Sequence, residues 1–473
     1  MTSTPASAAT ETTSPAPDPR RWSTLALLGI AQLMLIVDVT VVAIALPHMG
    51  ADLGLDREAT TWVVSAYTLA FGGLMLLGGR AADILGTRAV VLTGLGVFTG
   101  ASLVSGLAET PELLIGGRVA QGLGAALLSP AALAAVLHLF EGEERNRAMG
   151  IWSALGGGGA ALGVLLGGVL TAGPGWPWVF FVNVPIGIVV TVVLTRRLPR
   201  AATRSASGVD VLGAALVTAA TGTGIYALIG AGDRGWTDGT TLLLLAGSVV
   251  LYLLFGLRQR TARTPLMDLG LLARRPVASG TFLIVSATAL MVAGFFLGTF
   301  YLQHHAGKGA LLTGVLFLPI AIATMAGATA GGHLIARTGA RVLAASGFVV
   351  AALGFSVPAL LDGATAVVVG IAGGALGLGV LFVAASATAL GMIAPHEAGI
   401  ASGIVSTFHE FGASLGAAVI SSVAAASIAG STAAGFTDGF TLAAAVAATA
   451  ALVSLVLVPG RTTGSVPHTG GLH

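Results

Sequence analysis

Charged residues and cysteine are what this sequence lacks most. Of its 473 residues only 9% are charged, and there is no cysteine at all. A soluble domain carries about 25% charged residues, so a globule of this composition would have too little polar surface to face water. The absence of cysteine excludes disulfides and thiolate metal sites. The scarcity of charge indicates that lipid is the solvent around most of the chain.

A phosphate-binding loop is missing as well. No segment has the form Gly-x4-Gly-Lys-Ser/Thr, and the nearest one, Gly307-Lys308-Gly309, lacks both the first glycine and the hydroxyl. Direct use of ATP by this chain is therefore disfavoured.

Apolar runs of about 20 residues, long enough to span a bilayer, recur along the whole chain. The connections between them are short, and Gly and Pro inside the runs are compatible with helices that neighbouring helices support. The sequence therefore predicts an all-α integral membrane protein with fourteen transmembrane helices. The expected spans are residues 24–47, 61–79, 89–108, 112–138, 148–171, 178–197, 210–230, 240–257, 277–302, 311–335, 342–361, 364–391, 399–425 and 437–458.

The basic residues test this number of spans. When both termini are placed in the cytoplasm, 18 of the 22 basic residues fall in cytoplasmic segments. Only Arg57, Arg234 and Lys308 fall outside, and Arg118 lies within a span. An incorrect number of spans would scramble this alternation, so the pattern supports both the number and the orientation.

An internal repeat divides the chain into two related halves. Residues 79–88 and residues 332–341 carry Gly, Gly and Arg at identical offsets, and the glycines of the fifth and thirteenth spans also share their spacing. Parallel repeats of this kind are typical of transporters that rock two bundles around a central site. The sequence predicts two pseudo-symmetric six-helix bundles with two helices inserted between them.

The predicted divisions of the chain follow from this repeat. Residues 1–22 lack the basic and then apolar layout of a signal peptide and are expected to form a disordered cytoplasmic tail. The remaining divisions are an N-terminal bundle at 23–200, an inserted helix pair at 208–260, a C-terminal bundle at 276–458 and a cytoplasmic tail at 459–473.

The spacing Gly79-x3-Asp83-x2-Gly86-x-Arg88 has a physical interpretation of its own. Glycine permits a tight turn, and a carboxylate beside a helix N-terminus meets the helix dipole favourably. Arg88 would anchor the turn at the cytoplasmic face. An ordinary charged turn is the alternative, and the matching segment in the second half disfavours it.

This spacing resembles the loop signature of the major facilitator superfamily, which implies a latch between the two halves in one conformation. Other segments resemble the fourteen-helix drug:proton antiporter branch of that superfamily. They are the acidic first-span motif at residues 35–47, Arg118-x2-Gln121-Gly122 in the fourth span, and residues 178–187 in the sixth. The resemblance covers about residues 24–458.

The fifth span resembles the antiporter motif of the same branch. Its glycines at the family spacing are Gly150, Gly159, Gly163, Gly167 and Gly168. Val164 stands where the family usually has proline, which would remove a backbone hydrogen bond and fix a kink. The glycines still predict close packing and a pliable helix, so the resemblance implies antiport while the effect of Val164 stays open.

Three strongly ionisable residues lie well inside the predicted spans, namely Asp38, Arg118 and Glu410. Each costs about 2.5–3.5 kcal/mol at the centre of a membrane helix, so each is a functional candidate. At 1.5 Å per residue, Asp38 lies about 13 Å and Arg118 about 9 Å below the outer ends of their spans. The two are therefore predicted to reach each other.

This pair has two interpretations. Asp38 and Arg118 could form only a static ion pair, or Asp38 could load and unload a proton whose affinity Arg118 tunes. The resemblance implies the second role, because the matching arginine of the family is assigned to proton coupling.

Glu410 is predicted about 18 Å into the thirteenth span, near the midplane. Its counterpart in the first half is Ala161, so the acid occurs on one half alone. We interpret Glu410 as a proton carrier or as a binding site for a cationic substrate. A protonated acid bonded to a neighbour is the alternative.

Aromatic side chains could line an apolar cavity together with the two acids. For most of them, lipid contact or core packing is the better interpretation. The candidate cavity residues are Asp38, Tyr67, Trp152, Phe295, Tyr301, Phe408 and Glu410.

The leading hypothesis is an efflux antiporter of a bacterial plasma membrane. It would act as a monomer with both termini cytoplasmic, and would exchange protons for amphipathic, cationic or antibiotic-like molecules. Proton-coupled uptake and export of lipids or metabolites on the same scaffold are the alternatives. Three isolated ionisable residues do not supply the ligand cluster or nucleophile–base pair of a membrane-embedded enzyme. We thus expect no enzyme activity, no metal, no cofactor besides the proton gradient, and no nucleic acid partner.

Overall fold

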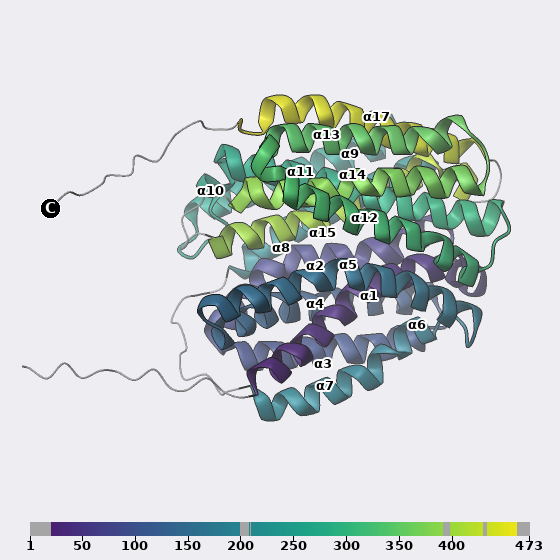
Figure 1. Cartoon of the computed structure of the whole chain (residues 1–473). Coiled ribbons are helices and arrows are strands. Elements are labelled where there is room, and N and C mark those ends of the chain that lie inside the picture. The colour runs from purple at the N-terminus through teal and green to yellow at the C-terminus, as the bar shows by residue number, and fades with distance from the viewer. Residues whose placement is uncertain (1–19, 199–207, 209, 391–397, 429–432, 461–473) are drawn as a thin grey trace, which may run out of the picture.

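Long helices make up the protein. The computed structural model describes residues 20–198, 208, 210–390, 398–428 and 433–460 (Figure 1). Fourteen stretches of the described chain are helical, long and apolar enough to cross a membrane, and these confirm the predicted all-α membrane fold. The chain runs back and forth, so each span lies antiparallel to the one before it.

The first half of the chain contains the first six spans. Its helices are α1 (Arg21–Leu53), α2 (Arg57–Leu85), α3 (Thr87–Gly106), α4 (Pro111–Leu139), α5 (Gly142–Ala172), α6 (Trp178–Phe181) and α7 (Asn183–Arg197). Within this half α4 packs against α2 and α3, and α1 packs against α5. We call the end of the bundle at which α2 begins the Arg57 end, and the opposite end the Arg80 end.

The second half contains the last six spans, and two further spans precede it. The inserted pair is α8 (Val211–Arg234) and α9 (Gly239–Thr261), followed by the short α10 (Leu269–Ala273). The second half comprises α11 (Arg275–Phe300), its π-helical continuation η1 (Tyr301–His305), α12 (Ala310–Thr338), α13 (Ala340–Leu360), α14 (Ala364–Leu390), α15 (Ala398–Val423), α16 (Ala425–Ile428) and α17 (Ala434–Leu457). Figure 1 shows the two halves as separate layers that meet along α2, α5, α12 and α15.

The internal repeat of the sequence is visible in the backbone. Gly86, between α2 and α3, has φ +88° and ψ 138°, and Gly339, between α12 and α13, has φ +80° and ψ 159°. Residues with a side chain rarely adopt this region, so glycine is required at both turns. Two residues on, Arg88 Nη2 donates to Thr195 O (2.6 Å) and Arg341 Nε donates to Val458 O (2.8 Å). Each arginine thus binds a carbonyl near the end of the last span of its own half.

The antiporter-motif glycines create close contact between α5 and its neighbours. Gly159 and Gly163 face Ile36 and Thr40 of α1 so closely that a methyl group would clash. Gly167 faces Ile44 of α1, and Gly168 faces α12, with space for a methyl group only in tight contact. Gly150 has open space beside it. In the second half, Gly412 and Gly416 of α15 bring α11 equally close. The repeat therefore preserves the packing of these two helix pairs. Val164 is fully buried within an uninterrupted α5.

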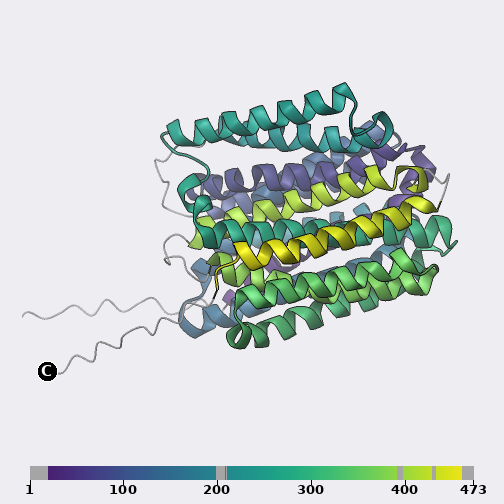
Figure 2. The same cartoon turned by 90° about the horizontal axis from the view of Figure 1, so that it is seen from above.

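The inserted pair lies along one side of the molecule. Figure 2 shows α8 and α9 at one edge, and α8 contacts both α2 and α15, which belong to different halves. The main contacts of α9 are with α8 and α10. The seam between α2 and α15 is therefore covered by α8.

The structure differs from the sequence-based expectation in the linker after α9. The sixth span comprises α6 and α7, and it is continuous between them, because Val182 has helical dihedral angles (φ −58°, ψ −31°) and its N donates to Trp178 O (3.1 Å). The linker after α9 contains α10, which no long periodic pattern announces. Met267 and Leu271 hold it in a cluster with Val277, Ala401 and Ile404, so burial stabilises a helix too short for propensity alone to form.

Candidate functional site

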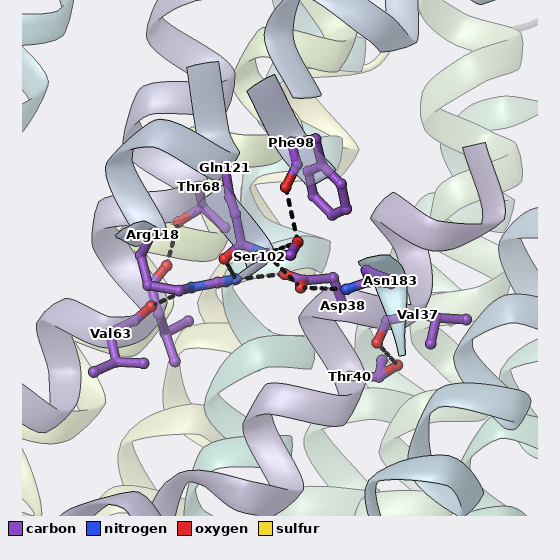
Figure 3. A network of polar contacts seen from close by, with 11 residues as sticks. Val37, Asp38, Thr40, Val63, Thr68, Phe98, Ser102, Arg118, Gln121 and Asn183 are labelled. Carbon is purple, nitrogen blue, oxygen red and sulfur yellow. Dashed lines mark hydrogen bonds and ion pairs between the residues drawn. The ribbon is translucent and has the colours of Figure 1, made fainter. Parts of the chain in front are cut away.

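Asp38 of α1 and Arg118 of α4 form an ion pair inside the first half (Figure 3). Each residue is 1% exposed, and Arg118 Nη1 donates to Asp38 Oδ2. Arg118 Nε also donates to Val63 O (2.9 Å) on α2. The predicted contact between the first and fourth spans is therefore present. Separating the two charges would be costly, because neither could be hydrated there.

Two amide side chains complete the surroundings of Asp38. Gln121 Nε2 donates to Asp38 Oδ1 (3.0 Å), and Asn183 Nδ2 approaches the same oxygen at 3.4 Å. Gln121 Oε1 in turn accepts from Arg118 Nη1 (2.9 Å), and Gln121 Nε2 also donates to Ser102 Oγ (2.9 Å). Both carboxylate oxygens are thus satisfied by N–H donors, which is an arrangement suited to ionised Asp38.

The sequence alone assigned no roles to Gln121, Asn183 or Ser102. Gln121 follows Arg118 by three residues, and this spacing on a helix places both side chains on one face. Asn183 lies on the sixth span beside Asp38. The first signal was present in the sequence as Arg118-x2-Gln121. The second was present only as a neutral amide within the apolar run 178–197, which does not indicate its partner.

Tyr67 of α2 lies against this network. The Arg118 guanidinium lies 4.3 Å from the centre of its ring, a cation–π distance. Its hydroxyl is fully buried and has no hydrogen-bond partner among the described residues. Tyr67 therefore contacts the ion pair from α2, the same helix that faces Glu410 at Gly72.

Glu410 lies on α15 at the seam with α2. Its side chain is half-buried, and its Cβ faces Gly72 of α2 so closely that a methyl group there would clash. Within the described chain its carboxylate makes no hydrogen bond or ion pair, and the buried Thr407 hydroxyl one turn away also lacks a partner. His409 faces elsewhere, because its Nδ1 pairs with Thr288 Oγ1 of α11 (2.9 Å). Glu410 is thus an unpaired acid between the two halves.

The aromatic candidates are distributed more widely. Trp152 packs on the core of the first half, and Phe295 packs edge-on against Phe317 (5.1 Å between ring centres). The Tyr301 hydroxyl accepts from Gly363 N (3.0 Å), and Phe408 packs edge-on against Phe411 of the same helix. Tyr67 is the one that contacts the ion pair.

The latch residues lie at the Arg80 end. Gly79 and Asp83 are within the last turns of α2, because that helix continues to Leu85, and Asp83 is exposed. The spacing suggested that Asp83 lies beside a helix N-terminus, but Asp83 instead lies near the C-terminal end of α2. Gly86 and Arg88 form the turn and the anchor described above.

Comparison with known proteins decides the family. A model of the Major Facilitator Superfamily matches residues 28–417 of this sequence. The chain belongs to the major facilitator superfamily. Its fourteen spans fit the fourteen-helix branch, and its family and fold make it a transporter and not an enzyme.

Several curated members of the superfamily are similar along most of the chain. The puromycin resistance protein pur8 of Streptomyces alboniger is 38% identical, over 85% of this chain and 81% of its own length. The cephamycin export protein CmcT of Amycolatopsis lactamdurans is 37% identical over 83% and 82%. The multidrug resistance protein Stp of Mycobacterium tuberculosis is 32% identical over 83% and 74%.

Solved structures of transporters share the fold. A bacterial homologue of the human lysosomal transporter Spinster, in an inward-facing and unoccupied conformation, has a TM-score of 0.66 at 16% identity, covering 93% of this chain and 98% of its own. A point mutant of the peptide transporter POT has a TM-score of 0.64 at 18% identity, covering 92% and 94%. At these identities the likeness concerns the fold alone.

Proposed function

We propose that this transporter exports amphipathic, cationic or antibiotic-like small molecules across a bacterial plasma membrane in exchange for protons. Support for export comes from the curated relatives, whose names describe resistance to puromycin, export of cephamycin and multidrug resistance. Support for coupling comes from the Asp38–Arg118 pair, a titratable group buried inside a membrane bundle at considerable energetic cost.

The orientation belongs to the same proposal. Both termini are cytoplasmic, so the Arg80 end faces the cytoplasm and the Arg57 end faces outside. The distribution of arginine and lysine supports this, with 18 of 22 basic residues on the cytoplasmic side. The protein acts as a monomer, and its two halves alternate around the central site.

The single observation that carries proton coupling is the set of contacts around Asp38. Arg118 and Gln121 hold it from α4, and Asn183 holds it from α7. A proton on Asp38 neutralises its charge and occupies one carboxylate oxygen. The ion pair and hydrogen bonds that join α4 and α7 to α1 are then weaker. Because α1 packs tightly on α5 through glycines, the two helices can then shift as one body. Protonation is thereby linked to movement between the halves.

Glu410 is the proposed binding site for the positive charge of a substrate. It is half-buried, unpaired within the described chain, and located where α2 of one half meets α15 of the other. A cationic substrate bound there would gain a charge partner in a medium of low dielectric constant. Both Tyr67, which contacts Arg118, and Gly72, which faces Glu410, belong to α2, so this helix connects the two positions. Trp152, Phe295, Tyr301 and Phe408 complete the proposed apolar lining.

The latch residues Gly79, Asp83, Gly86 and Arg88 control the Arg80 end in this proposal. Arg88 ties the turn after α2 to the end of α7, and the glycine conformation at Gly86 sets the angle between α2 and α3. Asp83 is exposed here, and is therefore free to bind the other half in a second conformation.

Transport by the purified protein in proteoliposomes tests the proposal. We expect counterflow of a cationic or antibiotic-like compound from a panel, and accumulation against its gradient when a pH gradient is imposed. An ionophore that collapses the pH gradient is the matched control and should abolish accumulation while counterflow persists. Accumulation that is indifferent to the ionophore would contradict proton coupling. Counterflow of lipids alone would support lipid export instead.

A further inference from the structure

A groove at the Arg80 end separates α2 from the linker that follows α9. Its volume is about 610 Å³, within the range of roughly 300–1,000 Å³ of small-molecule sites. The wall on the side of α2 is Arg80, and the opposite wall is formed by the last turn of α9, the linker and α10. The lining residues are Arg80, Gln259, Arg260, Pro265, Leu266, Met267, Asp268, Leu269, Gly270 and Ala273.

The linker wall is fixed in place. Gln259 is 5% exposed, and its Nε2 donates to Asp210 Oδ2 (2.9 Å) while its Oε1 accepts from Met267 N (3.1 Å). Arg258 Nε donates to Asp210 Oδ1 (2.9 Å). Burial of Asp210 would raise the pKa of its carboxyl, but hydrogen bonds from Gly213, Arg258 and Gln259 outweigh this and lower the pKa. Asp210 therefore stays ionised and keeps the linker anchored at neutral pH.

The charge of the groove is not balanced by the protein. Arg80 is half-buried and Arg260 is exposed, and neither makes a hydrogen bond or ion pair within the described residues. The one acid in the lining, Asp268, is engaged as the cap of α10, where its Oδ1 accepts from Gly270 N (2.8 Å). The lining thus carries two guanidinium groups, neither of them paired with its single carboxylate, and guanidinium groups bind phosphate oxygens well.

The rest of the lining is apolar. Pro265, Leu266, Met267, Leu269 and Ala273 provide a hydrophobic wall beside the two arginines. A free phosphate ion would leave this wall uncovered, whereas a phospholipid brings a headgroup phosphate and a hydrocarbon chain together. Arg80 and Arg260 both lie in the last turns of membrane-spanning helices, at the depth of lipid headgroups. Basic pockets at the cytoplasmic ends of membrane helices bind anionic headgroups in this way.

We propose that the groove binds the phosphate headgroup of an anionic phospholipid, such as phosphatidylglycerol, from the cytoplasmic leaflet. The headgroup bridges Arg80 of the first half and Arg260 in the last turn of α9, just before the linker that leads into the second half. Because Arg80 lies within the latch segment, an occupied groove stabilises the relative position of the halves seen here. This inference rests on the proposed orientation, and it makes transport dependent on anionic lipid.

Native mass spectrometry of the full-length protein with added phosphatidylglycerol tests the site. The double variant Arg80→Gln/Arg260→Gln should bind phosphatidylglycerol about thirty-fold more weakly, as expected from the loss of two charges at a membrane surface. Arg263→Gln is the matched control, because Arg263 is an exposed arginine of the same linker outside the groove, and its affinity should stay within about two-fold. Equal affinity of the double variant and the unaltered protein would overturn the proposal.

Two further binding measurements identify the ligand. Phosphatidylcholine should bind at least several-fold more weakly, and equal binding would show an apolar site that does not recognise charge. Inorganic phosphate should not displace phosphatidylglycerol, and displacement at comparable concentrations would overturn the lipid assignment. Size-exclusion profiles of the variants monitor folding. Because the readout is binding, a negative result here leaves proton-coupled export standing, and failure of export leaves this result intact.

Discussion

At the scale of single residues, Asp38 and Glu410 are two acids in opposite situations. Asp38 is enclosed by Arg118, Gln121 and Asn183, whereas Glu410 has no partner within the described chain. Removing the charge of Asp38 leaves buried Arg118 uncompensated, a change that costs about 3–5 kcal/mol in proteins. Removing the charge of Glu410 leaves no such orphan. The two acids should therefore respond differently to the same amide substitution.

Asp38→Asn should abolish proton-driven accumulation, because an amide releases no proton at any accessible pH. Exchange of substrate at equal pH on both sides should persist, since exchange requires alternation but no net proton movement. Accumulation and exchange of substrate in proteoliposomes, with proton flux followed by a pH-sensitive dye, check both expectations. The variant Asp38→Asn/Arg118→Gln removes the orphaned charge and controls for misfolding. Continued accumulation by a folded Asp38→Asn protein would make Asp38 structural and Glu410 the better proton carrier.

Glu410→Gln should weaken binding of cationic substrates about ten-fold or more while leaving neutral substrates within about two-fold. The reason is that only a cation loses a charge partner in the low-dielectric interior. Binding constants for one cationic and one neutral substrate, measured on the same preparation, give the comparison. An equal loss for both substrates would show that Glu410 shapes the site without reading charge.

The pairing of Asp38 with Arg118 could be predicted from the sequence, but the role of Asn183 could not. Asp38 and Arg118 could be paired beforehand because charges inside apolar runs are rare, and helix geometry gives their depth. Asn183 could not, since a neutral amide in an apolar run carries no such signal. The unpaired state of Glu410 was also out of reach, because it depends on what α2 places opposite, which is Gly72.

At the scale of elements, a polar clamp joins three helices at the Arg57 end. Arg57 of α2 is 9% exposed, and its guanidinium donates to Asp233 Oδ2 (2.5 Å) and Ile229 O (2.8 Å) of α8 and to Ser421 Oγ (3.0 Å) of α15. Ser421 also pairs with Thr61 of α2 (2.5 Å). The clamp thus holds the two halves together at this end, with an inserted helix as its third member.

Asp233→Asn should shift the equilibrium toward a conformation open at the Arg57 end. The shift should be modest, about five-fold or less, because the Asp233 side chain is 60% exposed and exposed ion pairs contribute at most about 1 kcal/mol. Distance measurements between spin labels on α2 and α15 report the populations. Asp438→Asn removes an exposed acid of α17 and serves as the control. Unchanged populations in Asp233→Asn would show that the charge of Asp233 takes no part in the clamp.

Element type was predictable here to a degree that element ends were not. Length and hydropathy gave fourteen spans, because lipid requires every backbone group of a span to be bonded internally. Pro47 suggested the end of the first span, yet α1 continues to Leu53 and ends at Gly54, which has φ +61°. The short α10 depends on tertiary packing, which a sequence window does not record.

At the scale of the whole molecule, the inserted pair makes the two seams between the halves unequal. The seam of α2 with α15 is covered by α8 and carries the Arg57 clamp, Glu410 and, at the Arg80 end, the contact of α10. The seam of α5 with α12 meets through glycines, with Gly168 facing Leu311 and Gly314 facing Val164. The sequence repeat predicted two pseudo-symmetric bundles with two inserted helices. Which of the two seams the inserted helices cover follows only from the packed structure.

The orientation of the whole molecule in the membrane can be tested by labelling single cysteines. The chain contains no cysteine, so a single introduced cysteine is the only target of a membrane-impermeant maleimide. Thr237→Cys and Arg263→Cys place exposed thiols just before and just after α9, which crosses once. Thr237→Cys should be labelled only from outside and Arg263→Cys only from the cytoplasm, because basic residues concentrate on the Arg263 side. Gly460→Cys, six spans after Arg263, should match Arg263→Cys. Reversed labelling would place the Arg80 groove in the outer leaflet, and labelling of Thr237→Cys and Arg263→Cys from one side would contradict the fourteen spans.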